Sequence, residues 1–87
     1  MDWDKLRIFH AVASASSLTH AGDSLHLSQS AVSRQIRALE ESLGTSLFHR
    51  HARGLILTEQ GELLHEATRV MNKRLEAAAA RIRDSAE

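Results

Sequence analysis

The segment after Ser28 separates apolar from polar side chains more clearly than any other part of the chain. Apolar side chains recur in it at steps of four, three and four: Val32, Ile36, Leu39 and Leu43. This spacing places them on one side of a helix. The other side carries hydroxyl and guanidinium groups, with one amide at the flank of the first turn: Ser30, Ser33, Arg34, Arg37 and Gln29. We therefore predict a helix with Ser28 as its N-cap that ends at Gly44, packs through one face and presents donors on the other.

Two shorter helices are predicted before this segment. The first runs from about Trp3 to Ala15 with Asp2 as its N-cap, and its apolar stripe is broad: Trp3, Leu6, Ile8, Phe9, Val12 and Ala13. The second follows the cap residue Ser17 and turns three apolar side chains inward: Leu18, Ala21 and Leu25. The sequence thus predicts three helices in its first half.

A tight turn, His26-Leu27, joins the second and third predicted helices, and it contains no glycine. Histidine is among the few other residue types that are enriched at positive φ. We therefore expect His26 to adopt that conformation and Leu27 to fill the core. Two helices around such a turn, the second with a donor-rich face, suit the DNA major groove, because Gln and Arg can pair bidentately with adenine and guanine edges.

The stretch 46–58 predicts a small two-stranded wing. Two strand-like runs, 47–50 and 55–57, surround the segment 51–54, in which Gly54 is expected to supply the turn. The tip of this wing is basic, because Arg50, His51 and Arg53 lie at or beside it.

A long helix is predicted after the cap residue Thr58, running nearly to the end of the sequence. Its apolar side chains form a narrow stripe at steps of three and four: Leu64, Ala67, Met71, Leu75, Ala78 and Ile82. The stripe is longer than one small domain can cover, which predicts a homodimer through this helix. We expect a winged domain over 1–58 and a dimerisation helix over 59–87. The pattern is still helical at the last residues, so we expect the sequence to be a piece of a longer protein.

Composition limits the remaining possibilities. The chain has 87 residues, enough for one small domain, and contains no Cys, so it can form no disulfide and no thiolate metal site. Met1 is followed by an acidic start with Asp2 and Asp4, unlike a signal peptide, and no apolar run approaches the ~20 residues that span a bilayer. A soluble cytoplasmic protein without membrane partners is the expectation.

The formal net charge is 0, but the charges are unevenly distributed. From 24 to 39 the only charged side chains are Arg34 and Arg37, and from 42 to 58 they are Arg50 and Arg53, with the acids elsewhere. One region is therefore locally basic. Few phosphate-neutralising cations predict modest non-specific affinity for nucleic acid and a salt dependence less steep than that of a strongly basic DNA-binding protein.

At this point the sequence resembles the N-terminal domain of the LysR-type transcriptional regulators, over about 4–70. The resemblance is carried by Phe9, Ala21, Leu25, the run Ser28 to Ser33, Ile36, Leu39, Glu40, Leu43, Gly44, Leu47, Phe48, Arg50, Gly54, Leu57, Thr58 and Gly61. Two longer runs, FHRHARGLILTEQGE and MDWDKLRIFHAV, resemble the alphaproteobacterial branch that contains the LsrB and VtlR regulators. Gly22 stands where this family usually has Ala, and Ser30 stands where Pro is also frequent.

The resemblance implies a mainly α fold, a winged helix-turn-helix followed by a linker helix that dimerises the domain. It implies binding to inverted-repeat promoter sites on double-stranded DNA, and tetramers of the full-length protein. It also implies a larger C-terminal domain that binds a small-molecule effector and lies outside this sequence. No cofactor and no catalysis are implied for the present chain.

The resemblance also assigns contacts to residues. Positions 29, 30, 33 and 34 (Gln29, Ser30, Ser33 and Arg34) would meet bases or adjacent phosphates, and Arg50, His51 and Arg53 would approach the minor groove. Ser17 to Thr19 would meet backbone phosphate, and free N–H groups at a helix start favour an anion there. Arg37 is a further candidate, although Glu41 at i+4 could pair with it instead. Ser28 is expected to act mainly as a cap, with contact to phosphate as a second role.

Other function classes are less well supported. His49 and His51 could chelate a metal, but no acid or Cys lies at a compatible spacing, so no metal site is expected. No hydrolase motif such as G-x-S-x-G occurs. The alternative of a different class is a protein-interaction module, which the neutral net charge would permit. Absent or shallow salt dependence of DNA binding would favour that alternative.

Overall fold

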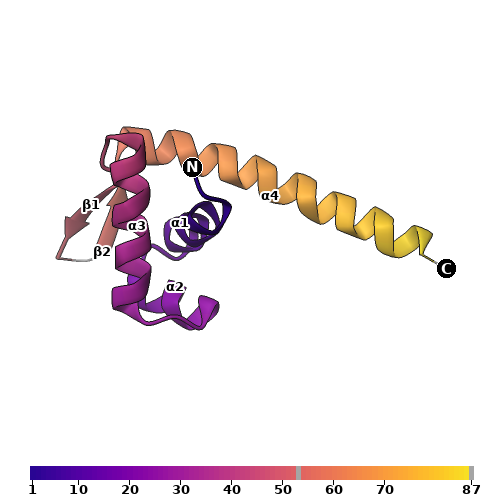
Figure 1. The fold of residues 1–87 in the computed structure, drawn as a ribbon, viewed down its shortest axis with the longest axis horizontal. Coiled ribbons are helices and arrows are strands. Elements are labelled where there is room, and N and C mark those ends of the chain that lie inside the picture. The colour runs from indigo at the N-terminus through magenta and orange to yellow at the C-terminus, as the bar shows by residue number, and fades with distance from the viewer. Residues whose placement is uncertain (53, 87) are drawn as a thin grey trace.

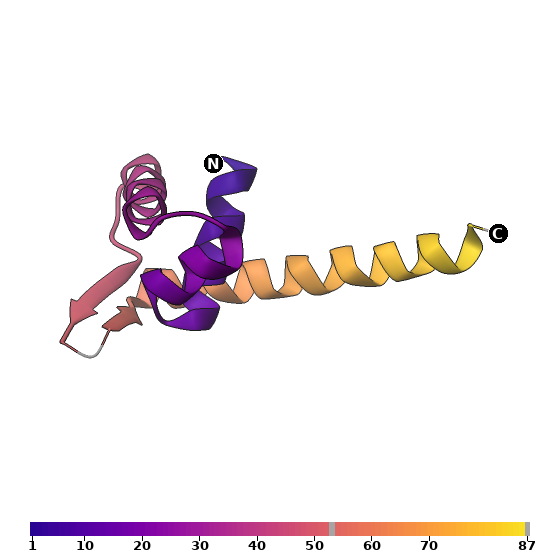
Figure 2. The same cartoon turned by 90° about the horizontal axis from the view of Figure 1, so that it is seen from below.

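The computed structural model describes residues 1–52 and 54–86. Its elements are α1 (Trp3–Ala15), α2 (Leu18–Leu25), α3 (Gln29–Leu43), β1 (Phe48–His51), β2 (Gly54–Leu57) and α4 (Glu59–Ser85). Figures 1 and 2 show α1, α2, α3 and the two strands gathered at one end of α4, whose C-terminal half extends away from them. The fold is mainly α with a small wing, as the sequence predicts.

Each predicted helix start is confirmed, because the expected side chain accepts a hydrogen bond from the first turn. Asp2 accepts from Asp4 N–H at 2.8 Å, Ser17 from His20 N–H at 3.3 Å and Ser28 from Ala31 N–H at 3.1 Å. The Asp4 N–H, assisted by the nearby Lys5, holds the pKa of the Asp2 carboxyl below its ordinary value. Local sequence therefore sets where these helices begin.

The core lies between α1, α2 and α3, and Leu47, directly before β1, is also buried in it. Its largest fully buried side chains are Phe9, Val12, Val32, Leu39 and Leu47. Three predicted core side chains lie outside it. Trp3 is 56% exposed because it stands at the start of α1, and Leu43 is exposed at the end of α3. Leu27, expected to fill the core, is 37% exposed.

The turn between α2 and α3 has the predicted backbone but a different packing. His26 adopts φ 59°, as expected, and its N–H reaches back to the carbonyls of α2. Leu27 N–H then donates to the Gly22 carbonyl at 2.8 Å. A side-chain carbon on Gly22 would lie 2.6 Å from the Leu27 carbonyl oxygen. Glycine is therefore needed at position 22 to let the turn backbone approach.

The wing is an antiparallel pair in which Phe48 faces Leu57, Arg50 faces Leu55 and His51 faces Gly54. β1 begins and ends one residue later than predicted, and β2 begins one residue earlier but ends at the predicted residue. Gly54 belongs to β2 and not to the turn, but its φ of 125° is still one that side chains rarely allow. Phe48 attaches the wing to the core, because its ring packs against the ring of Phe9 with the two ring centroids 5.4 Å apart.

Thr58 joins the wing to α4. Its hydroxyl accepts from Gly61 N–H at 2.9 Å, as predicted for a cap, and donates to the Ser46 carbonyl at 2.8 Å. The first turns of α4 pack on α1, and the remainder extends the molecule to 50 × 24 × 22 Å. In the described part of the chain, no helix combines the length and apolarity needed to cross a bilayer.

Candidate nucleic-acid interface

The outer face of α3, defined by Gln29, Ser30, Ser33, Arg34 and Arg37, is open to solvent. Ser33 is half-buried and the other four are exposed. These side chains surround a hollow of about 470 Å³ that also touches Leu18 and Arg50. The inner face is closed, since Val32, Ile36 and Leu39 are buried. The structure therefore brings together all five candidate residues that the sequence placed on α3.

The start of α2 lies beside the start of α3. The Thr19 hydroxyl donates to the Gln29 side-chain carbonyl at 3.5 Å, and the hydroxyls of Ser28 and Ser30 lie 3.4 Å apart. A second hollow, of about 420 Å³, runs between the α2 start and the wing and is lined in part by Ser17, Thr19 and His51. Predicted phosphate-contacting and base-contacting residues thus form one continuous polar surface.

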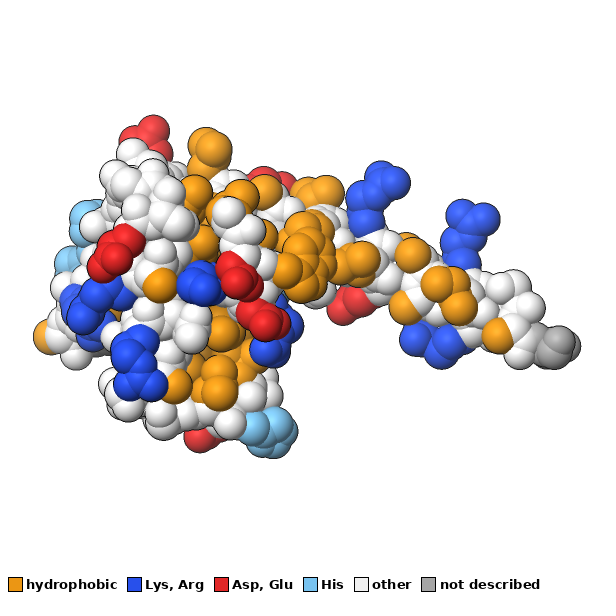
Figure 3. All heavy atoms as spheres, viewed as in Figure 1, with side chains coloured by type: hydrophobic (Ala, Val, Ile, Leu, Met, Phe, Trp, Pro, Cys, Tyr) orange, Lys and Arg blue, Asp and Glu red, His pale blue; other side chains and the backbone are white. Residues whose placement is uncertain are grey.

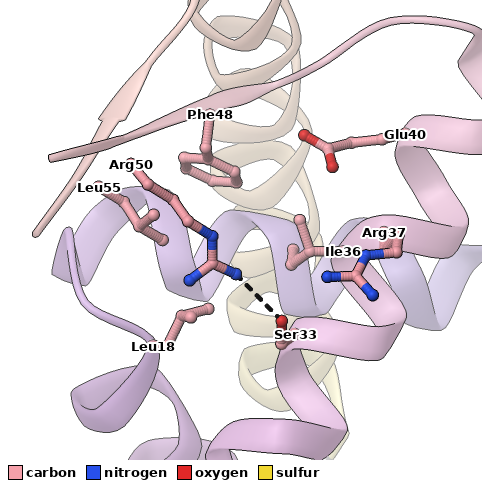
Figure 4. A pocket seen from close by; sticks show the side chains of 8 residues that line it. All are labelled: Leu18, Ser33, Ile36, Arg37, Glu40, Phe48, Arg50 and Leu55. Atoms are coloured by element: carbon pink, nitrogen blue, oxygen red, sulfur yellow. Dashed lines mark hydrogen bonds between the residues drawn. The ribbon is translucent and has the colours of Figure 1, made fainter.

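Arg50 does not extend from the tip of the wing. Side chains alternate along a strand, so Arg50 shares a face with Phe48, the face that turns toward the core. Its guanidinium passes Leu55 and Leu18 and donates from Nη2 to Ser33 Oγ at 3.2 Å (Figure 4). A third, smaller hollow of about 90 Å³ lies between α3 and the wing. Arg50 and Leu18 are the two residues that line this hollow and both of the others. Arg50 therefore belongs to the outer face of α3 as much as to the wing.

Two further contacts were predicted for the wing, at His51 and Arg53. His51 is exposed at the end of β1. Arg53 was predicted to meet the minor groove, and it lies outside the described residues.

The positive charge of this surface comes from Arg34, Arg37 and Arg50, and none of these side chains forms an ion pair with another described residue. Arg37 makes no ion pair with Glu41, although the sequence allowed such a pair one helical turn apart. Glu40, one turn away, is occupied elsewhere: its Oε2 accepts from Leu47 N–H at 2.7 Å. Figure 3 shows blue Lys and Arg side chains, with some red Asp and Glu side chains among them, over the end of the molecule that carries α3 and the wing. An exposed face of guanidinium, amide and hydroxyl groups can contact phosphates and base edges.

A family comparison decides what this arrangement is. Residues 3–62 match the family described as bacterial regulatory helix-turn-helix protein, lysR family. The chain belongs to the LysR family.

Two solved structures and one curated relative illustrate the likeness. The chain superposes on the DNA-binding domain of CbnR in a complex with DNA, with a TM-score of 0.81, 36% identity and full coverage of both chains. The DNA-binding domain of BenM, in a complex with catB site 1 DNA, gives 0.87 and 31% over 100% of this chain and 98% of that one. The RuBisCO operon transcriptional regulator of Allochromatium vinosum is 45% identical over 71 residues, 82% of this chain. This chain covers 24% of that relative's length.

The LysR-family chain has a second surface, on α4. Leu64 packs against the domain's own core, whereas farther along the predicted stripe Leu75 is 50% exposed and Ile82 is 66% exposed. At the near end an apolar hollow of about 410 Å³ is lined chiefly by Leu43, Leu63, Leu64 and Ala67. Figure 3 shows orange apolar side chains along the part of α4 that leaves the body. The stripe therefore starts in the core and continues uncovered.

A histidine pair lies where α1 meets α4. His10 Nδ1 lies 2.9 Å from Thr68 Oγ1, and that hydroxyl donates to the His65 carbonyl at 3.0 Å. Because the hydroxyl hydrogen is thus used, His10 Nδ1–H is the donor to Thr68. Burial, and then the neighbouring His65, lower the pKa of His10, while Glu76 acts in the opposite direction. Among residues 1–52 and 54–86, no three His, Cys, Asp or Glu side chains gather as metal ligands would.

Sequence reasoning missed three members of this surface arrangement. The Arg50–Ser33 bond and the Glu40–Leu47 bond join residues 17 and 7 positions apart, and Leu18 contributes to the floor beside α3. The alternation of Phe48 and Arg50 along β1 was a signal that could have placed Arg50. No comparable signal existed for Glu40.

Proposed function

We propose that this chain is the DNA-binding domain of a LysR-type transcriptional regulator, which binds double-stranded promoter DNA in a sequence-specific manner. The observation that supports this most is the open outer face of α3, whose donors point away from a fully packed inner face. The related domains of CbnR and BenM, solved with DNA, have the same fold. Here α3 enters the major groove and its side chains meet base edges.

Roles follow from position on the surface. Gln29, Ser30, Ser33 and Arg34 contact bases or the phosphates beside them, with Arg37 at the edge of the groove. Ser17, Thr19 and Ser28 lie at helix starts, where free N–H groups favour a backbone phosphate. His51 and Arg53 approach the flanking minor groove from the wing tip, where narrow A·T-rich tracts attract cationic side chains.

The domain acts as a homodimer on an inverted repeat. In this proposal, residues 1–58 form the DNA-contacting body, and 59–87 form the helix that pairs two copies. Its apolar stripe of Ala67, Met71, Leu75, Ala78 and Ile82, with Leu64 at its root, meets the same stripe of a second copy. The spacing of the two α3 helices then sets the spacing of the half-sites.

The whole protein extends this arrangement. We infer a cytoplasmic regulator without enzymatic activity or cofactor in this chain, which becomes a tetramer through a further domain that binds a small-molecule effector. The runs FHRHARGLILTEQGE and MDWDKLRIFHAV support membership of the alphaproteobacterial branch that contains LsrB and VtlR.

Selection from a random duplex DNA pool tests the function. The wild-type chain should enrich an inverted repeat, and Arg34→Ala should lose or blur one base position in each half-site. Arg83→Ala is the matched control: it removes the same charge from an exposed site near the end of α4 and should leave the motif intact.

Failure to enrich any motif would count against the proposal. Sedimentation of the same sample then separates two causes. A monomer would mean that pairing needs the rest of the protein, whereas a dimer that binds DNA weakly at low and high salt would support the protein-interaction alternative.

A further inference from the structure

The bond between Arg50 and Ser33 constrains what Ser33 can offer to DNA. A guanidinium carries hydrogen-bond donors only, so in this contact Ser33 Oγ is the acceptor. A serine hydroxyl has one hydrogen of its own, and in the described residues the structure records no acceptor for it. That hydrogen remains available on the outer face of α3, beside the hollow that Gln29, Ser30 and Arg34 line.

The neighbouring positive charge strengthens this bias. Arg50 holds its guanidinium against one side of the Ser33 oxygen, where it repels any further donor and attracts groups with partial negative charge. In the major groove the acceptors are guanine N7 and O6, adenine N7 and thymine O4, whereas cytosine N4 and adenine N6 present donors. A free serine could serve either kind of group, but a serine already held by arginine favours an acceptor.

Arg50 is also well supported in its position. It lies on the core-facing side of β1, paired across the strands with Leu55, and Leu18 lies beside it (Figure 4). It lines the narrow hollow of about 90 Å³ that Phe48 and Ile36 close from the other side. Although Arg50 is exposed, Leu18 and Leu55 flank its stem, and its Nη2 already reaches Ser33 Oγ at 3.2 Å in the structure without DNA.

We propose that Arg50 is a specificity-positioning residue: by donating to Ser33 it makes that hydroxyl a hydrogen-bond donor and so biases one base position of each half-site toward an acceptor edge. The proposal rests on the DNA-binding function proposed above and adds to it the chemistry of one base. It differs from the simpler role of a phosphate-neutralising wing arginine, which weakens all sequences alike.

The test compares base preferences, not affinity alone. Wild type, Ser33→Ala, Arg50→Met and the double variant are each taken through selection on a pool randomised around the wild-type motif. Met keeps much of the apolar stem of Arg50 and removes its donors. We expect Ser33→Ala and Arg50→Met to relax the same base position, from a purine or thymine preference to little preference, and the double variant to relax it no further.

Arg37→Met is the matched control, because it removes a guanidinium from the same hollow that makes no bond to Ser33. It should leave the preference at that position unchanged, whatever it does to affinity. If Arg50→Met lowers affinity for every sequence and keeps the wild-type preference, or relaxes a different position from Ser33→Ala, the proposal is wrong. An absence of any motif with wild type would instead count against the underlying function, and sedimentation would then separate its two causes as described above.

A second measurement needs no protein variant. At a purine position in the affected base pair, 7-deazaguanine or 7-deazaadenine removes the N7 acceptor and leaves base pairing intact; at a thymine, 4-thiothymine weakens the O4 acceptor. Wild type should bind the analogue about threefold to tenfold more weakly, the value of one neutral hydrogen bond. Ser33→Ala should be insensitive to the same analogue. Equal binding of wild type to the natural and analogue duplexes would overturn the proposal even if Arg50→Met failed to fold.

Discussion

α3 and α4 are both amphipathic helices, but they differ in what covers their apolar faces. α3 buries Val32, Ile36 and Leu39 within its own domain and leaves a polar face open. α4 is covered only over its first turns, and beyond them Leu75 and Ile82 remain in solvent. A single copy of the chain buries the apolar face of α3, whereas much of the apolar face of α4 stays exposed to solvent.

The difference separates two tasks. A polar face held on a packed helix can meet DNA without further folding, and its contacts with Thr19 and Arg50 keep it ordered. An apolar face that a small domain cannot cover favours association, because burying it against a second copy removes it from water. We therefore expect a single copy to recognise the bases of one half-site. The spacing between two half-sites is expected to depend on the dimer.

The largest expected effect is on the inner face of α3. Leu39→Ala should lower the free energy of unfolding by about 2–5 kcal/mol, because Leu39 is fully buried and its loss leaves a cavity. Urea unfolding of the wild type and variant measures this. Leu75→Ala is the matched control on α4, and at a concentration where the chain is monomeric it should change stability little. Equal losses from both substitutions would contradict the distinction between the two helices.

The next effect concerns association. Leu75→Asp places a charge in the exposed stripe of α4, and it should convert the dimer to a monomer in sedimentation runs. Affinity for an inverted repeat should then fall about a hundredfold or more, because the two half-sites no longer act together. Lys73→Asp alters more charge, but on the far side of the helix, and should leave the dimer intact. A dimer that survives Leu75→Asp would remove the stripe from the interface.

A smaller effect is expected on the outer face of α3. Arg34→Ala should cost about 1–3 kcal/mol of binding to the selected site if Arg34 pairs bidentately with a base. Its affinity for a scrambled duplex should change much less. Fluorescence anisotropy with both duplexes gives the two values, and parallel losses on both would make Arg34 a phosphate contact.

The smallest expected effect is a pH dependence of the folding stability, caused by His10 at the contact between α1 and α4. The pKa of His10 is lowered from its ordinary value of 6.5, chiefly by burial. Below that pH the unfolded chain binds a proton that the folded chain takes up less readily, so stability should fall as the pH drops through 6.5 and should be level above it. His10→Asn can keep a donor near Thr68 but cannot titrate. Thermal unfolding at a series of pH values should show a flatter profile for this variant; an unchanged profile would assign the dependence to another group.

Much of the fold follows from local sequence. The caps at Asp2, Ser17, Ser28 and Thr58, and the positive φ of His26, depend on interactions within a few residues and were predictable. The amphipathic pattern also separated the inner and outer faces of α3. These features need no knowledge of how the elements pack.

Features set by packing were not predictable in the same way. The side chain of Leu27 lies in the turn between α2 and α3, and Trp3 and Leu43 lie at helix ends, and all three are exposed although the sequence placed them in the core. The placement of Arg50 over Ser33 depends on how the wing packs against α3, a contact between residues 17 positions apart. The pattern of residues in the wing predicted the two strands but not which side chain of β1 would reach α3.

The most direct test of the central claim uses the absence of cysteine from the chain. A single cysteine is introduced by Ser30→Cys on the outer face of α3 or by Ser14→Cys on α1, both exposed positions. Each variant is incubated with the selected duplex carrying an activated thiol tethered to a base in the major groove. Disulfide crosslinking at position 30 and none at position 14 is the predicted result. Equal crosslinking, or crosslinking at position 14 alone, would contradict the assignment of α3 as the helix that meets DNA.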